Sequence, residues 1–370
     1  MNIGIMTWFH YPNYGTALQV FALCKYLEER NNTVKVIQYY PNPEPMYYSS
    51  KFDEYLYRGK RKLYTILSSP NIVEETSGDL FRKFLLDSIS FTGKVASDKD
   101  LDSLNFTFDC FICGSDQIWS PLNFDPHYYL DFVKDPEKMI AYAPSIGVFQ
   151  IESPEYRKEI SELTNRFKYL SVREKTGADL IKRLNGKDAR VVLDPTLLLN
   201  KDYWNRYIPG SGEGKYLLAY FLRENKRYWK VVKTVAKKLH LDVKVIPVFE
   251  DDLKMPGAQR GVGPDELVKL FRGASFICTD SFHGMAFSVN FNKQFLPFKR
   301  FASSAKDNQN SRVYDFLESV GLKDRMYRGG EVNKYLRRID YGPVNSRLET
   351  LREESREYLD GALKEIKIDS

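Results

Sequence analysis

One histidine stands in a stretch of chain whose residue types suit proton transfer on a negatively charged ligand. Residues 276–284 read FICTDSFHG, an apolar run followed by apolar residues at helical spacing. This predicts a buried strand turning into a helix, with Thr279 or Asp280 as N-cap, and the first N–H groups of such a helix favour an anion. His283 falls in that first turn, and an imidazole titrates near neutrality. We expect acid–base chemistry here; the alternative is a histidine that only caps the helix or faces solvent.

Polar residues also follow three other predicted strands, at residues 13–16 (NYGT), 114–119 (GSDQIW) and 171–175 (SVREK). Parallel strands place their carboxyl ends at one edge of a sheet, where ligands of α/β proteins bind. The guanidinium of Arg173 suits phosphate or carboxylate, whereas a surface ion pair with Glu174 is the alternative. Residues 13–16 lack the glycines of a dinucleotide site, and serve either a ligand or a tight connection.

Length and composition predict a globular protein of two domains. It has 370 residues, 43% hydrophobic and 28% charged, with a formal net charge of +6. Lys and Arg are scattered, which favours anionic ligands or a membrane surface and argues against nucleic acid as partner. We expect a cytoplasmic protein without a signal peptide or membrane span, at most peripheral at the inner face of a membrane.

Cysteine usage points to no metal or redox site. Cys110 and Cys113 form a CxxC pair, but residues three apart in a strand point to opposite faces and cannot share a metal or a disulfide. Thiols in apolar surroundings fit a reducing compartment.

Periodicity predicts two Rossmann-like α/β domains facing across a cleft. Strands are expected at residues 2–8, 33–39, 108–113, 139–143, 169–172, 190–193, 216–222, 243–248, 275–278 and 294–298. The predicted domains are residues 1–197, with a helical insertion at about 40–100, residues 215–330, which contain the turn with His283, and a helical extension at 331–370. Helical stretches are expected around 55–67 and 80–87, and the Pro- and Gly-containing residues 197–214 read as a linker. A terminal helix, starting at a capping box over residues 346–349, would brace the two domains.

Five motifs in this order resemble the polysaccharide pyruvyltransferase family. They are NYGTALQ at residues 13–19, GSDQIW at 114–119, SVRE at 171–174, LDPT at 193–196 and DSFHG at 280–284. The resemblance implies a two-domain GT-B-like enzyme that moves the enolpyruvyl group of phosphoenolpyruvate onto a sugar, forming a pyruvate ketal. It also implies that His283 is the acid–base or donor-contacting histidine and that Arg173 binds the donor anion.

The chain departs from the family at the histidine turn. Some members carry Arg-Leu-His-Gly there, and Ser281 and Phe282 stand in those places here. One donor-binding cation is therefore missing, and Arg300, Lys306 or Arg312 are the candidates to replace it.

The predicted site has three parts. The catalytic residues are His283 and Asp280, with Asp280 orienting or tuning the imidazole. Donor-binding residues are Arg173, Ser281, Phe282, Gly284 and Arg312. Acceptor candidates are Asn13, Tyr14, Gly15, Thr16, Ser115, Asp116 and Glu174, of which Asp116 or Glu174 would activate the hydroxyl. No metal or cofactor is expected, since phosphoenolpyruvate is a substrate.

Two other functions remain open from the sequence. A GT-B glycosyltransferase using a nucleotide-sugar would share the fold and the basic character, and a non-catalytic glycan-binding protein would bind sugar without a donor. The expected partners are a small-molecule donor and a sugar or lipid-linked oligosaccharide acceptor. The sequence leaves the acceptor sugar and the oligomeric state open.

Overall fold

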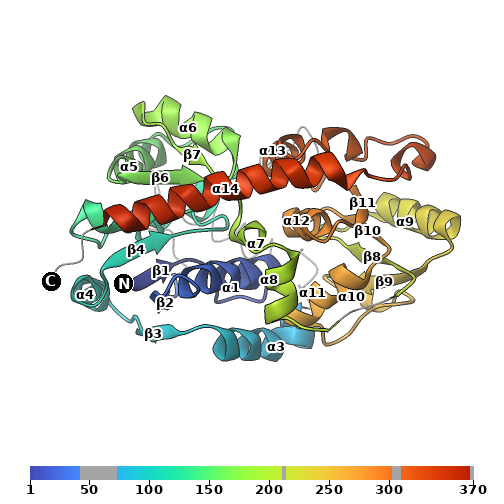
Figure 1. Cartoon of the computed structure of the whole chain (residues 1–370), viewed down its shortest axis with the longest axis horizontal. Coiled ribbons are helices and arrows are strands. Elements are labelled where there is room, and N and C mark those ends of the chain that lie inside the picture. Colours follow the sequence, from blue (N-terminus) through green and yellow to red (C-terminus); the bar gives the residue numbers. More distant parts are fainter. Residues whose placement is uncertain (42–72, 211–213, 302–309, 367–370) are drawn as a thin grey trace, which may run out of the picture.

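The computed structural model describes residues 1–41, 73–210, 214–301 and 310–366, and within them two parallel sheets form two α/β domains (Figure 1). The larger sheet has seven strands in the order β3-β2-β1-β4-β5-β6-β7. These are β1 (Asn2–Met6), β2 (Thr33–Gln38), β3 (Phe91–Lys94), β4 (Cys110–Cys113), β5 (Met139–Ala141), β6 (Tyr169–Val172) and β7 (Arg190–Val191). The predicted strands are confirmed to within a few residues, and β3 was missed. The fold class, α/β with two Rossmann-like domains, is confirmed.

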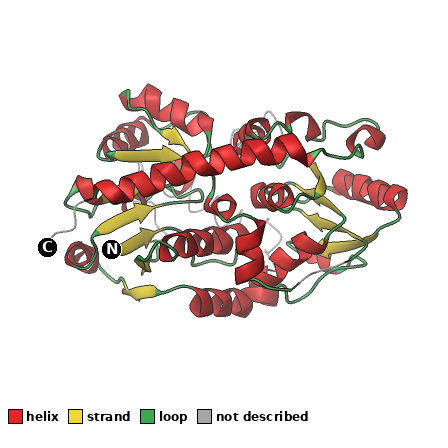
Figure 2. Cartoon of the chain, viewed as in Figure 1, coloured by secondary structure: helices red, strands yellow, loops and turns green. Residues whose placement is uncertain are grey.

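Helices connect the strands of this sheet and cover its two faces (Figure 2). They are α1 (Tyr14–Glu28), α3 (Val73–Ser88), α4 (Asp98–Ser103), α5 (Pro154–Asn165) and α6 (Lys175–Asn185). After β1 the chain winds outward through β2 and β3, then returns to place β4 on the other side of β1. The ends of β1 and β4 therefore border the point where the winding direction reverses, which is where such sheets bind ligands.

The smaller sheet has the same kind of topology. Its described strands run in the order β11-β10-β8-β9, all parallel, with a reversal between β8 and β10. They are β8 (Tyr216–Tyr220), β9 (Asp242–Ile246), β10 (Phe276–Thr279) and β11 (Gln294–Pro297). The helices of this domain are α9 (Lys226–Leu239), α10 (Glu250–Leu253), α11 (Pro264–Gly273), α12 (Phe282–Asn290) and α13 (Ser311–Ser319).

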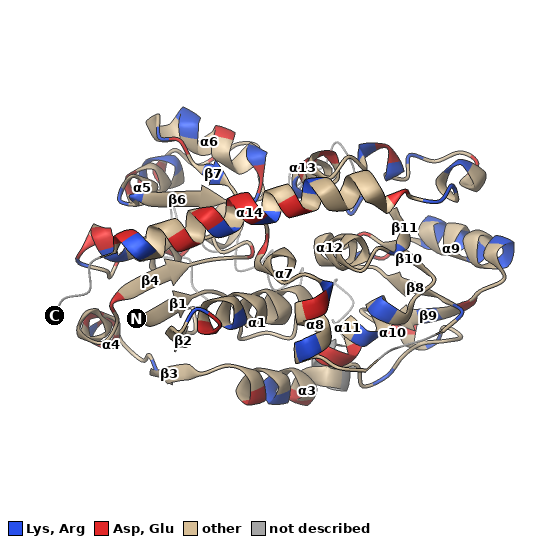
Figure 3. Cartoon of the chain, in the orientation of Figure 1, with Lys and Arg blue, Asp and Glu red and all other residues tan. Residues whose placement is uncertain are grey.

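The two domains share one apolar core, so the predicted linker at residues 197–214 is wrong over most of its length. That stretch holds the end of α7 (Pro195–Leu198) and all of α8 (Lys201–Tyr207). Trp204 of α8 is fully buried, with its ring 5.7 Å from Phe21 of α1 and 5.1 Å from Phe287 of α12. Of the helices that meet here, α12 carries no Lys, Arg, Asp or Glu, whereas α8 carries its charges around the buried Trp204 (Figure 3). Leu197, Leu198 and Trp204 bury apolar side chains and so hold this stretch in the core, although the glycines near residue 210 had indicated a linker.

A long helix, α14 (Tyr341–Glu365), crosses both domains and braces them as predicted (Figure 1). Near its start, the Tyr341 hydroxyl donates to backbone carbonyls beside α12. Farther along, the Arg352 guanidinium donates to Leu197 O (2.7 Å), and the Tyr358 hydroxyl donates to Ala141 O in β5 (2.9 Å). The helix begins five residues before the predicted capping box, because the Asp340 carboxylate accepts from the Gly342 N–H.

Other expectations have mixed outcomes. Cys110 packs in the core that contains α1, and Cys113 packs in the core on the other face, so the rejection of the CxxC pair is confirmed. The helix predicted at residues 80–87 lies within α3, whereas the one predicted around 55–67 falls outside the described residues. In the described parts of the chain, no helix is both long and apolar enough to cross a membrane. The domain boundaries at 197 and 215 stay predictions, with one sheet on either side of them.

Candidate functional site

The strand-to-helix turns of the two domains meet directly. A methyl group placed on Gly15, at the start of α1, would lie 2.0 Å from Nδ1 of His283 at the start of α12. The neighbouring Tyr14 hydroxyl donates across the interface to Val262 O (2.9 Å). Only a residue without a side chain lets the imidazole approach the first turn of α1 this closely. Two predicted motifs far apart in sequence thus form one site.

The turn before α12 is held by its own side chains. Ser281 is the N-cap, its hydroxyl accepting from the Gly284 N–H (3.3 Å), so the expectation of Thr279 or Asp280 as N-cap is wrong. The Thr279 hydroxyl instead accepts from the Ser281 N–H (3.0 Å). A side chain at Gly284 would collide with that hydroxyl, at 2.4 Å. These contacts fix the backbone that carries His283.

Asp194, the N-cap of α7, is the partner of His283. Its Oδ2 lies 3.4 Å from His283 Nε2, an ion-pair distance without the alignment of a hydrogen bond, and accepts from Arg173 Nη1 at 2.7 Å. Its Oδ1 accepts from the N–H and the hydroxyl of Thr196. Burial alone would raise the pKa of this carboxyl, but His283, Arg173 and the Thr196 N–H lower it below its ordinary value. The side chain is therefore a fixed negative charge at neutral pH.

Arg173 is a buried cation with hydrogen-bonding capacity to spare. Its side chain is 2% exposed, yet its Nε and Nη2 have no hydrogen-bond partner among the described residues. The guanidinium lies 4.5 Å from the centre of the Phe282 ring, and its Nε is 4.0 Å from Glu174 Oε2, too far for a hydrogen bond. Burial lowers the pKa of Arg173, but Asp194, Asp116 and Glu174 outweigh it and raise the pKa. Such unsatisfied donors are the kind that a bound carboxylate or phosphate satisfies.

Two further arginines surround this group. Arg312, in the first turn of α13, is buried, and burial together with the charges of Arg173 and Arg300 lowers its pKa to about 9. A lowered arginine pKa means that the surroundings disfavour another positive charge, despite Glu174 and Asp116 nearby. Arg300 and Arg312 stay the candidates for the cation that the turn lacks, whereas Lys306 falls outside the described residues. Such a cluster favours an anionic ligand.

Asp280 contacts the neighbouring strand rather than the histidine. Its Oδ1 accepts from the Leu222 N–H (2.6 Å) just beyond β8, and its Oδ2 has no hydrogen-bond partner in the described chain. Burial raises the pKa of Asp280 to about 7. The expected Asp280–His283 pairing does not match these contacts, because the carboxylate turns back toward the reversal point of the smaller sheet. Its catalytic role stays a prediction.

The acceptor candidates of the larger domain form a hydrogen-bonded network. The Thr16 hydroxyl donates to Asp116 and lies 3.2 Å from the Tyr11 hydroxyl, and Asn13 caps α1 by accepting from the Thr16 N–H. The Ser115 hydroxyl donates to Ala143 O (2.9 Å) and lies 3.3 Å from Asp194 Oδ2. Thr16 and Ser115 thereby tie both strand ends to the charged centre.

Glu174 is held mainly by backbone. Its Oε1 accepts from the Ser145 hydroxyl and from the N–H groups of Ile146 and Gly147, at 2.9–3.0 Å. Its Oε2 has no hydrogen-bond partner in the described residues. One oxygen therefore fixes the loop after β5, and the other stays near Arg173.

The structure brings most predicted residues together and adds one that the sequence left without a role. His283, Arg173, Phe282, Arg312, Gly15, Thr16, Ser115 and Asp116 converge, whereas Ser281 and Gly284 shape the turn. Asp194 had only the LDPT motif as its signal. An aspartate followed by Pro and Thr directly after a strand also predicts an N-cap, which would have placed it at the same sheet edge. The described residues contain no group of three His, Cys, Asp or Glu side chains arranged to hold a metal ion.

Comparison with solved structures returns sugar-nucleotide enzymes at low identity. The UDP-GlcNAc 2-epimerase of Neisseria meningitidis bound to UDP-GlcNAc is 11% identical, with a TM-score of 0.49 over 98% of this chain and 100% of that one. The Methanocaldococcus jannaschii UDP-GlcNAc 2-epimerase in complex with UDP-GlcNAc and UDP is 14% identical, with a TM-score of 0.43 over 95% and 100%. The E. coli heptosyltransferase WaaC with ADP is 10% identical, with a TM-score of 0.36 over 87% and 99%. No curated protein matches the sequence.

The family comparison is decisive. The model of the family described as polysaccharide pyruvyl transferase matches residues 13–300, most of the chain. This range runs from the turn before α1, through Arg173 and Asp194, to the turn that carries His283, and so contains all the motifs on which the resemblance rested. The chain belongs to the polysaccharide pyruvyl transferase family.

Proposed function

We propose that this protein transfers the enolpyruvyl group of phosphoenolpyruvate to two hydroxyls of a sugar, forming a pyruvate ketal on a glycan precursor. The observation that carries the proposal is the buried Arg173, with two unpartnered donor nitrogens beside Arg312 and His283. A buried polar group without a partner costs about 1–3 kcal/mol, and more when it is charged. A small anion with a carboxylate and a phosphate would remove that cost.

In this proposal each residue has one task. Arg173 and Arg312 bind the donor anion, and the N-terminus of α12 adds its dipole. His283 delivers a proton to the vinyl carbon as a sugar hydroxyl attacks the neighbouring carbon. The second hydroxyl then displaces phosphate. One hydroxyl proton ends on the new methyl group and the other leaves with phosphate, so the step needs no oxidant or metal.

Asp194 acts through His283 and Arg173. Its carboxylate stands within ion-pair distance of both and so holds the imidazole and the guanidinium in place. Asp116, which accepts from Thr16, is the candidate for contacting the acceptor hydroxyl. We further propose a sugar or lipid-linked oligosaccharide as acceptor, handled in the cytoplasm or at the inner face of a membrane.

Ligand-induced stabilisation tests the donor. Phosphoenolpyruvate at about a hundred times its Kd should stabilise the fold by roughly 2.7 kcal/mol, an easily measured rise in Tm. The rise should vanish in Arg173→Gln and persist in Arg206→Gln, whose side chain is 66% exposed. A rise with UDP- or GDP-sugars only would instead make the protein a glycosyltransferase. A rise with neither donor but with glycans would make it a binding protein.

A further inference from the structure

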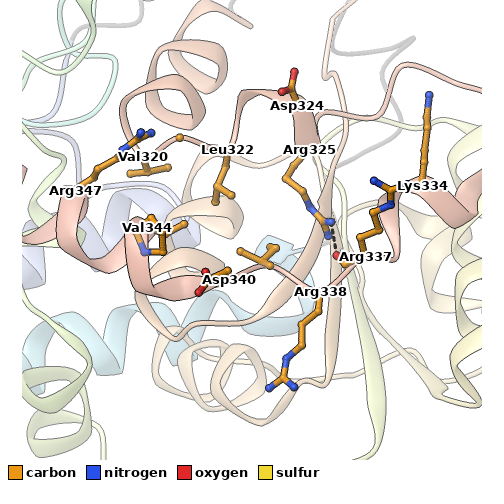
Figure 4. A pocket seen from close by; sticks show the side chains of 13 residues that line it. Val320, Leu322, Asp324, Arg325, Lys334, Arg337, Arg338, Asp340, Val344 and Arg347 are labelled. Atoms are coloured by element: carbon orange, nitrogen blue, oxygen red, sulfur yellow. Dashed lines mark hydrogen bonds between the residues drawn. The ribbon is translucent and has the colours of Figure 1, made fainter.

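A second anion-attracting feature lies away from the interdomain site. At the start of α14, a pocket of about 410 Å³ opens between the segment after α13 and the segment leading into α14 (Figure 4). Five basic side chains line it: Arg325, Lys334, Arg337, Arg338 and Arg347. None of its lining residues belongs to the site around His283, so the two features are separate.

The charges of this pocket are largely uncompensated. Against five basic residues stand two acids, Asp324 and Asp340. Asp340 already accepts from the Gly342 N–H (3.0 Å) as N-cap of α14. Within the chain that the structure describes, Arg337, Arg338 and Arg347 form no ion pair. Exposed arginines that serve only solubility are usually interspersed with acids, whereas these gather around one hollow.

Arg325 holds the basic segment in place. Its Nη1 donates to Arg337 O at 2.8 Å (Figure 4), and its Nη2 donates to Phe295 O in β11, also at 2.8 Å. Its Nε has no hydrogen-bond partner among the described residues and keeps one donor. The backbone that carries Arg337 and Arg338 is thereby fixed to the smaller sheet before any ligand arrives. This lowers the entropic cost of binding.

Buried apolar side chains and the start of α14 form the rest of the pocket. Val320, Leu322 and Val344 line the pocket and are themselves buried, so its base is formed by packed core side chains. The N-terminus of the 25-residue α14 contributes the positive end of its dipole, whereas its Gly342 N–H is bound by Asp340 and Pro343 has no N–H. A guanidinium binds carboxylate and phosphate alike, but a phosphate offers more oxygens to several guanidinium groups at once.

We propose that this pocket binds a phosphate group carrying about two negative charges, as in a phosphomonoester or a diphosphate. The group reaches the protein either on a soluble metabolite or as the headgroup of an anionic membrane lipid. The ligand class follows from the charge balance and from the arginines, and is independent of the donor proposed for the interdomain site.

Two assays on the full-length protein test this and separate the two sources. Pyrophosphate binding is measured by calorimetry at low ionic strength, and vesicle binding by co-sedimentation with vesicles of phosphatidic acid, a phosphomonoester lipid, or of phosphatidylcholine. The test variant is Arg337→Gln/Arg338→Gln, whose side chains are exposed, so folding is retained. The matched control is Lys237→Gln/Lys238→Gln on α9, which removes the same charge from exposed positions of the same domain.

We expect a loss of about tenfold or more in affinity in the test variant, and an unchanged affinity in the control. Selective loss of pyrophosphate binding supports a soluble ligand, and selective loss of binding to phosphatidic acid vesicles supports a lipid headgroup. Equal binding by all three proteins, equal losses in both variants, or no binding by the wild type would overturn the proposal. None of these outcomes depends on phosphoenolpyruvate, so the donor assay stands or fails separately.

Discussion

The two halves of the site are built differently. The larger domain supplies buried charges locked by many partners: Asp194 contacts Arg173, Ser115 and Thr196, and Glu174 accepts three hydrogen bonds. The smaller domain supplies His283, whose side chain is 13% exposed and whose charged contact is the single carboxylate of Asp194 across the interface. The larger domain thus supplies fixed charges, and the smaller domain supplies the imidazole. Proton transfer in such a site depends on the contact between the halves rather than on either half alone.

We expect the largest effect from a substitution among the buried charges of the larger domain. Asp194→Asn leaves Arg173 buried without its counter-charge, and we expect a loss of about 3–5 kcal/mol in the free energy of unfolding. The depressed pKa of Asp194 means that its contribution is present at neutral pH and is lost as the pH falls through the folded-state value. Urea unfolding at neutral pH measures the loss. Asp79→Asn, at a side chain 94% exposed, should change it by less than about 0.5 kcal/mol.

The contact between the halves can be tested by one methyl group. Gly15→Ala would force His283 away from Asp194, so we expect phosphoenolpyruvate to bind about tenfold more weakly. Gly361→Ala, in α14 with no atom near its added methyl group, is the control. It should leave binding unchanged. Equal affinity in the two variants would show that the close approach of α1 to the imidazole has no part in donor binding.

Asp280 provides a pH signature of the smaller domain. Its pKa is raised to about 7 by burial, so its neutral form stabilises the fold below the unfolded-state pKa. That stability is lost as the pH rises toward 7. Asp280→Asn should remove this dependence. The difference in unfolding free energy between variant and wild type should shift by about 1–3 kcal/mol between pH 4 and pH 8, in favour of the variant at the higher pH. A difference that stays constant would mean that the carboxyl titrates normally.

The two helix caps offer the smallest and most direct comparison. Ser281→Ala leaves the buried Gly284 N–H without its acceptor and should cost about 1–2 kcal/mol. Asn13→Ala removes the corresponding bond to the Thr16 N–H at a half-exposed position, where water can replace it, and should cost about 0.5 kcal/mol. Thermal unfolding ranks the two, and the reverse order would contradict the view that the smaller domain's turn is the better enclosed one.

Local pattern predicted the elements but not the partners across them. Apolar runs ending in polar residues located nearly every strand, and the motif at residues 280–284 located the turn with His283, because both depend on neighbours in sequence. Asp280 was predicted to orient His283 because the two are neighbours in sequence. The structure shows that a residue at a strand end can turn toward an adjacent strand, as Asp280 does toward Leu222, while the carboxylate beside His283 is Asp194 at the start of α7.

The linker prediction for residues 197–214 was wrong because it rested on a few residues of that stretch. Pro209, Gly210, Gly212 and Gly214 made residues 197–214 read as a linker, yet Leu197, Leu198 and Trp204 decide the structure by burial. The start of α14 was placed at a capping box because Ser346 and Glu349 fit that motif, whereas Asp340 acts as the cap.

The position of α14 has a consequence for how the protein is made. This helix follows both sheets in the sequence and is the element that joins β5 to α12. During synthesis, each sheet can form as its own segment leaves the ribosome, from the N-terminus onward. The brace is added only afterwards, so a nascent chain holds all the charged residues of the site before the helix that joins its two halves exists.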